Sequence, residues 1–316
     1  MMTKLYKFMG ADIVDKLMMD KENIGIKFSY LKDYNDPYEF FLIINYDRTP
    51  GELAFYSEMI DMVIERPATC FARSPVITPM WAHYAGNSSG FVIEIDEEKL
   101  KEHLKELNFD EHTIIEDVKY QDEPDDINDL LARAYHIGKP RYIYFLQRYI
   151  HSSAYLRKQT CWSYEQERRL ITSEEALKKI NDWLMLLPVP IDCVTSFIVG
   201  KNANETLKEK IRQLADQTQT RYLEMVFGRT TTQPFMLLDG KQSHIFKNGE
   251  IVPAPSACQR CKEPIMTSEK LCSWCSITDD HRQNAALSNS FRMLQDAGIL
   301  DQYLSTMHQI GRNSSR

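Results

Sequence analysis

The sequence lacks a hydrophobic run long enough to cross a membrane. Its longest uncharged apolar stretches, residues 183–189 and 193–200, are far shorter than the roughly 20 residues that a spanning helix needs. Residues 1–10 contain lysines, but no continuous apolar run follows them, so nothing there resembles a secretion signal. These absences predict a soluble, cytoplasmic protein that does not engage a membrane.

The cysteines do not form a complete set of pairs. The chain has seven, and an odd number excludes a framework in which every cysteine forms a disulfide. Without a secretion signal, we expect the protein to work in a reducing compartment. Cys70, Cys161 and Cys193 lie in apolar or strand-like contexts, which predict buried thiols rather than metal ligands.

A basic excess is also missing. The net charge is −7, and the first 257 residues alone carry −8. Proteins that grip nucleic acid non-specifically usually show a basic footprint, so this balance argues mildly against a broad nucleic-acid surface. A local patch created by folding stays open, because stacking side chains can hold a single strand with few charges.

The chain contains no glycine-rich dinucleotide fingerprint, no P-loop and no internal repeat. Instead, strand and helix patterns alternate without a regular βαβ rhythm, which predicts an α+β fold. We expect strands over residues 4–8, 25–29, 68–72, 90–96, 116–120, 166–172, 194–199 and 222–227, and helices over residues 11–19, 53–65, 97–107, 127–150, 174–187 and 204–217.

Four cysteines near the C-terminus are spaced as two pairs. Cys258 and Cys261 form one Cys-x2-Cys turn, ten residues follow, and Cys272 and Cys275 form the second. Two such turns direct four sulfurs to one point and predict a structural Zn²⁺ with no open position for chemistry. The alternative is four reduced cysteines that pack as small hydrophobes, and a segment too short for its own core disfavours it.

A proline-containing stretch predicts the division of the chain. Residues 252–257 read as a linker between an α+β catalytic-like domain over 1–251 and a small zinc ribbon over 258–275. Residues 276–316 then form a helical tail, with apolar residues at helical spacing over 285–310 and a break at Gly298. Such a tail either packs on the main domain or docks a partner, such as an antitoxin.

Three clusters in the main domain are candidates for chemistry. The first contains Ser29, then Asn35, Asp36 and Pro37, and ends at Glu39 beside an aromatic run. Asn and Asp side chains bond their own backbone and Pro fixes φ, so this segment predicts a turn. A purely structural turn and a binding role both remain open.

The second cluster holds Trp81, His83 and Tyr84 within four residues. These side chains offer stacking surfaces and hydrogen-bond donors to a planar ligand. The alternative is that Trp81 and Tyr84 fill the core and His83 is a satisfied partner.

The third cluster contains Glu165, just before the strand predicted over residues 166–172, and Glu167 within it. On a helix the two side chains would diverge, and the motif would mean little. Residues two apart on a strand share a face, so the two carboxylates point the same way. Their mutual repulsion pushes their pKa values apart, which suits acid–base or cation-stabilising work.

Together these motifs resemble a large bacterial family catalogued only as a domain of unknown function. The resemblance spans roughly residues 4–220 and leaves out the zinc module and the tail. It rests on Leu5-Tyr6-Lys7-Phe8, Phe28-Ser29 with Asn35 to Glu39, Trp81 to Ala85 with Gly90, Lys158 with Trp162, Glu165, Glu167 and Arg169, and Phe197 to Gly200.

That family in turn is similar to divergent ADP-ribosyltransferases, which bind NAD in a split, strongly bent pair of small β-sheets surrounded by helices. The resemblance implies that NAD is the substrate. It implies NAD-binding roles for Tyr6, Lys7, Ser29, Asn35, Asp36 and Trp81. Lys7 stands where the first strand of such enzymes usually has Arg or His.

The same resemblance implies catalytic roles for four residues. Glu167 would stabilise the oxocarbenium-like cation that develops when the nicotinamide–ribose bond breaks. Glu165 would orient or deprotonate the acceptor. Tyr84 would stack on the nicotinamide together with Trp81, and His83 would bond the ribose or phosphate.

We therefore expect an NAD-dependent ADP-ribosyltransferase, of the toxin or anti-phage defence type, that modifies a nucleic acid or a protein. One alternative is a non-catalytic module that senses a nucleotide and recruits a partner. The other is a nuclease or hydrolase that holds Mg²⁺ with Glu165, Glu167 and Asp36. The acceptor is not specified by the sequence.

Overall fold

The computed structural model describes residues 4–40, 42–107, 113–124, 126–181, 184–266 and 269–313. The chain forms two units, Met1–Ala254 and Pro255–Arg316. Pro255 lies inside the stretch 252–257 that the sequence predicts as a linker, whereas Val252 and Pro253 belong to the last strand of the first unit. None of the described helices is both long and apolar enough to span a bilayer.

The first unit is built on a curled mixed sheet, which has ten strands among the described residues. Its order is β15-β14-β13-β12-β11-β4-β1-β3-β8-β5. Neighbours are antiparallel except β11 and β12, which α6 connects. The strands are β1 (Lys4–Met9), β3 (Ala68–Ala72), β4 (Phe91–Asp96), β5 (Ile114–Asp117), β8 (Glu167–Ile171), β11 (Val194–Val199), β12 (Arg221–Val226), β13 (Phe235–Leu238), β14 (Gln242–Lys247) and β15 (Glu250–Pro253).

A second sheet has the order β2-β10-β9, with β2 at Asn23–Phe28, β10 at Leu184–Pro190 and β9 at Lys178–Asn181. It meets the main sheet where Ser29 and Ala68 exchange backbone hydrogen bonds of 3.1 and 2.9 Å. A parallel pair of two-residue strands, β6 (Lys119–Tyr120) and β7 (Arg157–Lys158), completes the β-structure of the described residues. The mixed α+β class predicted from the sequence is confirmed.

The helix predicted over residues 174–187 is wrong. The chain makes a short 3₁₀ turn at Glu174–Ala176 and then enters β9 and β10. Burial alternates along β10, with Met185, Leu187 and Val189 facing the core. This period of two belongs to a strand, and the strand continues past the predicted helix end to Pro190.

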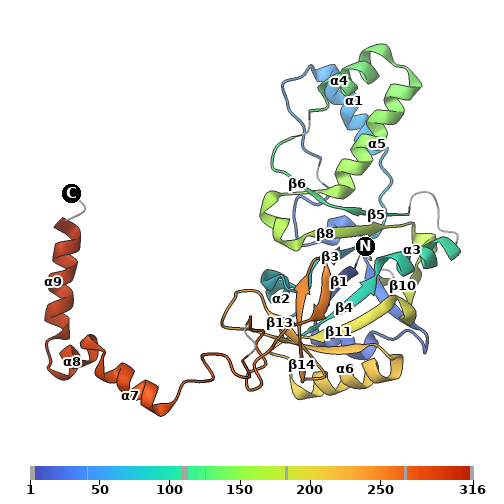
Figure 1. Cartoon of the computed structure of the whole chain (residues 1–316). Coiled ribbons are helices and arrows are strands. Elements are labelled where there is room, and N and C mark those ends of the chain that lie inside the picture. Colours follow the sequence, from blue (N-terminus) through green and yellow to red (C-terminus); the bar gives the residue numbers. More distant parts are fainter. Residues whose placement is uncertain are drawn as a thin grey trace. The chain divides into compact units, whose positions relative to one another are not determined.

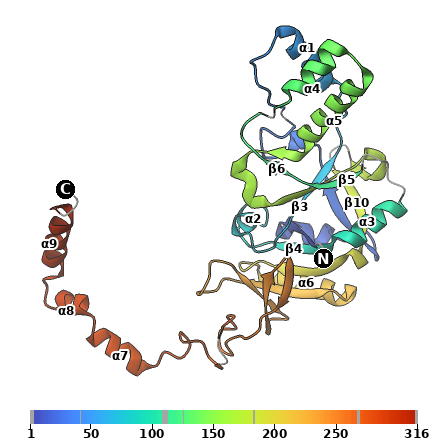
Figure 2. The same cartoon turned by 45° about the horizontal axis from the view of Figure 1, so that its top comes forward.

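The helices predicted along the chain are largely present. A helical lobe consists of α1 (Pro50–Asp61), α4 (Asn128–Ala132), the π-helical turn η3 (Arg133–Ile137) and α5 (Pro140–Leu156), which lie together in both views (Figures 1 and 2). Gly138, with φ of 64°, breaks the helix predicted over 127–150. Pro140 then begins α5 at a position that needs no N–H donor.

The remaining helices cover the sheets. They are α2 (Thr78–His83), α3 (Glu97–Glu106) and α6 (Glu205–Thr218), and the side chains of Asp96 and Asn204 cap the last two. Side chains of β1 alternate between two apolar clusters, because successive residues of a strand face opposite sides. Leu5 and Met9 join the cluster with α6, whereas Tyr6 and Phe8 join the cluster with α2.

The second unit contains the cysteine turns followed by α7 (Asp279–Leu287), α8 (Ser290–Asp296) and α9 (Leu300–Asn313). Gly298 has φ of 73° and separates α8 from α9, at the break that the sequence predicts. Apolar side chains of these helices are exposed, among them Phe291, Met293 and Met307.

Candidate active site and metal centre

Side chains from several distant segments line one cavity of about 460 Å³ in the first unit. The segments are β1 with the 3₁₀ turn after it (Ala11–Lys16), β2 with the loop that follows, β3, the end of α2, β7, the turn leading into β8, and β10. Eight of the ten residues predicted to bind or act on NAD line it: Tyr6, Lys7, Ser29, Asn35, Asp36, Tyr84, Glu165 and Glu167. The junction between the two sheets therefore forms the candidate site.

Two predicted residues do not line this cavity. Trp81 is fully buried, donates its indole N–H to the Pro75 carbonyl at 2.6 Å and packs edge-on against Phe8. His83 is exposed, and its ring lies 6.1 Å from that of Tyr164. The structure therefore places Trp81 in the core, which was one of the two alternatives. Of Trp81, His83 and Tyr84, Tyr84 lines the cavity.

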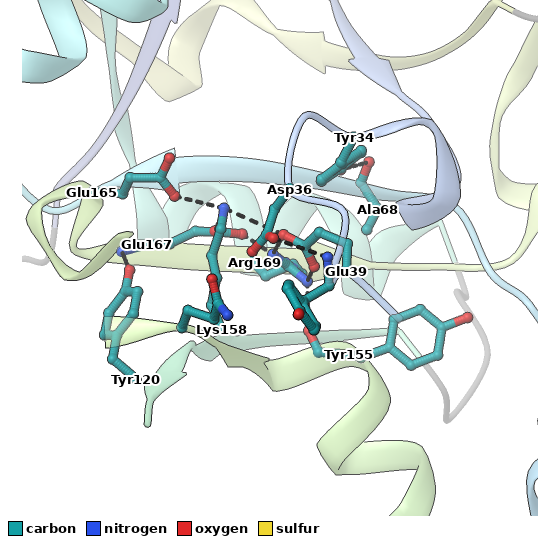
Figure 3. A network of polar contacts seen from close by, with 12 residues as sticks. Tyr34, Asp36, Glu39, Ala68, Tyr120, Tyr155, Lys158, Glu165, Glu167 and Arg169 are labelled. Carbon is teal, nitrogen blue, oxygen red and sulfur yellow. Dashed lines mark hydrogen bonds and ion pairs between the residues drawn. The ribbon is translucent and has the colours of Figure 1, made fainter. Parts of the chain in front are cut away.

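Glu165 and Glu167 are joined by a buried lysine (Figure 3). The Lys158 ammonium donates to Glu165 at 2.7 Å and to Glu167 at 3.3 Å, and it lies 3.2 Å from Glu39. The Tyr84 hydroxyl donates to the other oxygen of Glu165 at 2.6 Å. The two carboxyl groups thus share one cation at the wall of the cavity.

Both glutamates face the cavity for a reason that differs from the prediction. Glu165 does not lie on the strand but ends a 3₁₀ turn, η4 (Thr160–Glu165), and only Glu167 belongs to β8. Gln166 between them has the left-handed backbone conformation, with φ of 46°. This sharp turn, rather than strand pleating, directs Glu165 to the side that Glu167 occupies.

A fully buried arginine anchors the network. Arg169 donates to both oxygens of Glu39 at 2.8 and 2.9 Å, to Glu167 at 2.6 Å and to the Tyr155 carbonyl at 2.8 Å. Because Glu39 follows the Asn-Asp-Pro turn, this pair holds the loop after β2 against β8 (Figure 3). Arg169 and Glu39 are therefore positioning residues.

Asp36 forms the structural turn that was one of the two alternatives, and one of its oxygens stays without a partner. One of its oxygens accepts the Tyr38 backbone N–H at 2.9 Å, as an Asx turn requires. The other, Oδ2, is buried and has no hydrogen-bond partner in the described structure. Since buried carboxylate oxygens normally have a donor, this atom marks a place for a ligand hydroxyl or amide within the cavity.

The pKa values of the two glutamates are shifted in opposite directions. Burial opposes the charged form of Glu167, but Arg169 and Lys158 outweigh it and lower the pKa to about 2. Burial raises the pKa of Glu165, although Lys158 and Tyr84 hydrogen-bond to it. Neighbouring carboxyl groups whose pKa values are pushed apart in this way suit one anionic and one proton-transferring role.

Lys7 and Cys70 line the cavity from β1 and β3, which adjoin β8 in the strand order β1-β3-β8 of the sheet. The Lys7 ammonium donates to Thr69 Oγ1 at 2.8 Å and to the Cys70 carbonyl at 2.9 Å, and burial lowers its pKa. Burial and the neighbouring Glu167 raise the pKa of the Cys70 thiol to about 12, which excludes it as a thiolate nucleophile. The Tyr6 hydroxyl donates to Glu94 at 3.0 Å, so it is engaged in the core.

The four C-terminal cysteines form a separate cluster. The sulfurs of Cys258, Cys261, Cys272 and Cys275 lie within 4.8 Å of one another, and the described residues contain no other such group of metal-ligating side chains. Cys261 and Cys272 are 3.8 Å apart, too far for a disulfide but equal to the edge of a tetrahedron with metal–sulfur bonds of about 2.3 Å. The cluster can therefore hold one metal ion.

The three remaining cysteines are free. Cys193 is buried, Cys70 is partly buried and Cys161 is exposed. The prediction of a buried thiol is thus wrong for Cys161, because the 3₁₀ turn η4 places its side chain at the surface.

Lys158, Arg169 and Glu39 were not predicted as site residues, although each lies inside a motif quoted above. Their role depends on contacts across as many as 130 positions of sequence, which no local pattern reports. The sequence does contain one signal for them. Lys158 and Arg169 flank the Glu-x-Glu motif, and buried carboxylates need cationic partners.

Comparison with known proteins identifies part of the chain. Residues 80–170 match the model of a family described as a protein of unknown function, DUF2971. This span contains Tyr84, Lys158, Glu165 and Glu167, so the centre of the candidate site lies within it. The match supports membership of a domain-of-unknown-function family. No match was found among curated proteins or among solved structures.

Proposed function

We propose that the first unit is an NAD-dependent ADP-ribosyltransferase with Glu167 and Glu165 at its reaction centre. The observation that carries this proposal is the convergence of eight implied NAD-site residues on one cavity. They come from segments as distant as Tyr6 and Glu167, and the resemblance that selected them contained no spatial information.

The cavity has the size of a small-molecule site and carries cationic groups and one unpaired acceptor along its wall. Its volume of about 460 Å³ lies within the roughly 300–1,000 Å³ of small-molecule sites. Lys7, Lys16 and Lys27 line it and offer cationic groups for a diphosphate, while Asp36 Oδ2 offers an acceptor for a ribose hydroxyl. The positively charged nicotinamide ring complements the anionic Glu167.

The reaction follows from the charge difference between the two glutamates. Breaking the bond between nicotinamide and ribose C1′ releases neutral nicotinamide with the bonding electrons and leaves positive charge on the ribose. Glu167, held ionised by Arg169 and Lys158, stabilises that charge. The acceptor then bonds to C1′, and its proton passes to Glu165, which its raised pKa suits for proton transfer.

The same contacts favour a transferase over a Mg²⁺-dependent nuclease or hydrolase. Lys158 donates to Glu165 and Glu167, and Arg169 takes the second oxygen of Glu167. These ion pairs occupy the carboxylate oxygens that a magnesium site would need. A non-catalytic nucleotide sensor would bind NAD in the same cavity without cleaving it. The experiment below distinguishes such a sensor from a transferase.

Incubating the purified protein with NAD labelled in the adenylate phosphate tests the proposal. We expect release of free nicotinamide, measured chromatographically, and transfer of the label to a macromolecule in a cell lysate. Tight NAD binding in a thermal-shift assay without nicotinamide release would support the sensor and exclude the transferase.

The rate of ADP-ribosyl transfer to the acceptor should depend on the ionisation of Glu165. A carboxyl group with a raised pKa loses its negative charge as the pH falls, starting above its ordinary value of 4.5. We therefore expect transfer to decline on the acid side at a pH above 4.5, and Glu165→Gln to remove this decline along with most of the activity. A pH–rate profile identical in wild type and Glu165→Gln would exclude this role.

We propose further that the cysteine cluster binds a structural Zn²⁺, because four thiolates in tetrahedral spacing are its preferred ligands. The purified protein should contain one zinc per chain, and Cys272→Ser with Cys275→Ser should lose it. Proteolysis should then cut residues 258–275, while nicotinamide release continues because the cavity lies in the first unit. Metal analysis that finds no zinc in the wild type would contradict the assignment.

A further inference from the structure

The helix α5 carries a basic and aromatic face that the proposed reaction does not use. Residues 130–164 contain six lysines and arginines and no aspartate or glutamate, in a first unit that is otherwise acidic. Arg141, Tyr144, Phe145 and Arg148 follow a spacing of three and four residues and are all exposed. They lie on one side of the helix. Lys139 occupies the N-cap position without a side-chain cap bond and is exposed at the start of the helix.

We call Lys139, Arg141, Tyr144, Phe145 and Arg148 the α5 stripe. The opposite side of α5 buries Leu146 and Ile150 in the core of the helical lobe. The stripe is therefore not needed for packing. In agreement with this, Tyr144 and Phe145 are each 54% exposed to solvent. Their ring centroids lie 5.8 Å apart, so they form one continuous aromatic surface.

The positive charges of the stripe are not neutralised by described neighbours. The nearby carboxylates Glu52 and Asp129 lie against His136 at 3.6 Å and Arg133 at 2.6 Å. None of the described carboxylates lies within ion-pair distance of Lys139, Arg141 or Arg148. Arg141 donates to the Tyr142 hydroxyl at 2.8 Å and lies over the Tyr142 ring, but these contacts leave its positive charge in place. A row of cations without carboxylate partners that flanks exposed rings is complementary to a strand of phosphates with unpaired bases.

We propose that the α5 stripe binds single-stranded nucleic acid, which makes a single strand the acceptor of the proposed ADP-ribosyl transfer. The two rings stack on bases, and Lys139, Arg141 and Arg148 contact phosphates. A duplex is disfavoured because its bases are already stacked and hidden from the rings. The acceptor assignment rests on the proposed transferase function, whereas the binding does not.

The position of α5 connects the stripe to the reaction centre. The helix ends at Leu156, and Lys158, which bridges Glu165 and Glu167, follows in β7. From Arg148 to Lys158 the chain advances by about 15 to 20 Å. A strand that lies along the stripe therefore needs only a few further nucleotides to reach the cavity.

Fluorescence anisotropy with a labelled twenty-nucleotide oligothymidylate, measured without NAD, tests the binding. The wild-type protein should bind with a log–log salt slope of about −2, as expected for three phosphate contacts. Arg141→Ala with Arg148→Ala should flatten this slope by about 1.4. Tyr144→Ala with Phe145→Ala should weaken binding at least about 10-fold and leave the slope unchanged.

Matched variants elsewhere on the first unit provide the controls. Lys210→Ala with Arg212→Ala removes two charges from α6, and Phe227→Ala removes another exposed ring, so both should bind as the wild type does. Absence of oligonucleotide binding by the folded wild type would overturn the proposal, as would undiminished binding by the Tyr144/Phe145 variant. If the Arg141/Arg148 and Tyr144/Phe145 variants instead change the self-association of the protein, measured by light scattering, the stripe is a protein contact and the proposal is wrong. Nicotinamide release tests the transferase separately.

Discussion

Glu167→Gln is expected to lower nicotinamide release from NAD at least about 100-fold, as removal of a preorganised charge-stabilising group does in other enzymes. Glutamine keeps the shape of the side chain but removes the negative charge, which Arg169 and Lys158 hold in place down to a pH of about 2. The developing ribose cation then loses the anion that the proposed mechanism places beside it.

A second buried glutamate supplies the control for this experiment. Glu97 is equally buried and ion-paired, to Arg168 and to Arg73 at 3.0 Å, but it does not line the cavity. Glu97→Gln should therefore retain activity, and a thermal-shift assay should confirm that both variants fold and that Glu167→Gln still binds NAD. Equal rates for Glu167→Gln and the wild type would remove Glu167 from the mechanism.

Arg169→Met should lower the free energy of unfolding by about 3 to 5 kcal/mol, because it leaves buried carboxylates without their main cation. Arg169 is fully buried and supplies four hydrogen bonds, to Glu39, Glu167 and the Tyr155 carbonyl. Methionine fills much of the same volume but returns none of these bonds. Urea unfolding measures the change.

Two further variants separate this effect from a general loss of charge. Arg212→Met, at a surface position on α6, should cost less than about 1 kcal/mol, because surface ion pairs contribute little. Adding Glu39→Gln to Arg169→Met should recover part of the lost stability, since it removes one of the stranded charges. A cost below about 1 kcal/mol for Arg169→Met would show that the network is not what holds the loop after β2.

Eight of the residues that line the cavity could be named from the sequence because each belongs to a short motif with its own chemical signature. Glu165 and Glu167 stand two residues apart, and Asn35-Asp36-Pro37 is readable as a turn. The C-terminal cysteines are the clearest case, because their spacing alone directs four sulfurs to one point.

Contacts between distant residues could not be predicted in the same way. Glu39 and Arg169 are 130 positions apart, and only the folded chain shows that they form one ion pair. Trp81 and Tyr84 are neighbours in one motif, yet α2 directs the first into the core and the second to the cavity. Residues 184–190 were misjudged because a short apolar run fits a buried helix as well as a strand.

The exposed side of α5 could not be predicted from the sequence either. Helical spacing predicts a helix over residues 127–150, but both of its sides carry aromatic residues. Only the packing of α1 and α4 decides that Leu146 and Ile150 are covered while Tyr144 and Phe145 stay exposed. The negative net charge of the whole chain therefore gave no indication of the local basic surface on α5.

The most direct test of the central claim is a crystal structure of the protein with an NAD analogue in which a methylene group replaces the ribose ring oxygen, so that the ligand is not cleaved. The account predicts that the analogue occupies the cavity between β1, β3 and β8. Its ribose should lie beside the Glu167 carboxylate, with a polar group of the ligand on Asp36 Oδ2. An analogue bound elsewhere, or an empty cavity at saturating analogue, would contradict it.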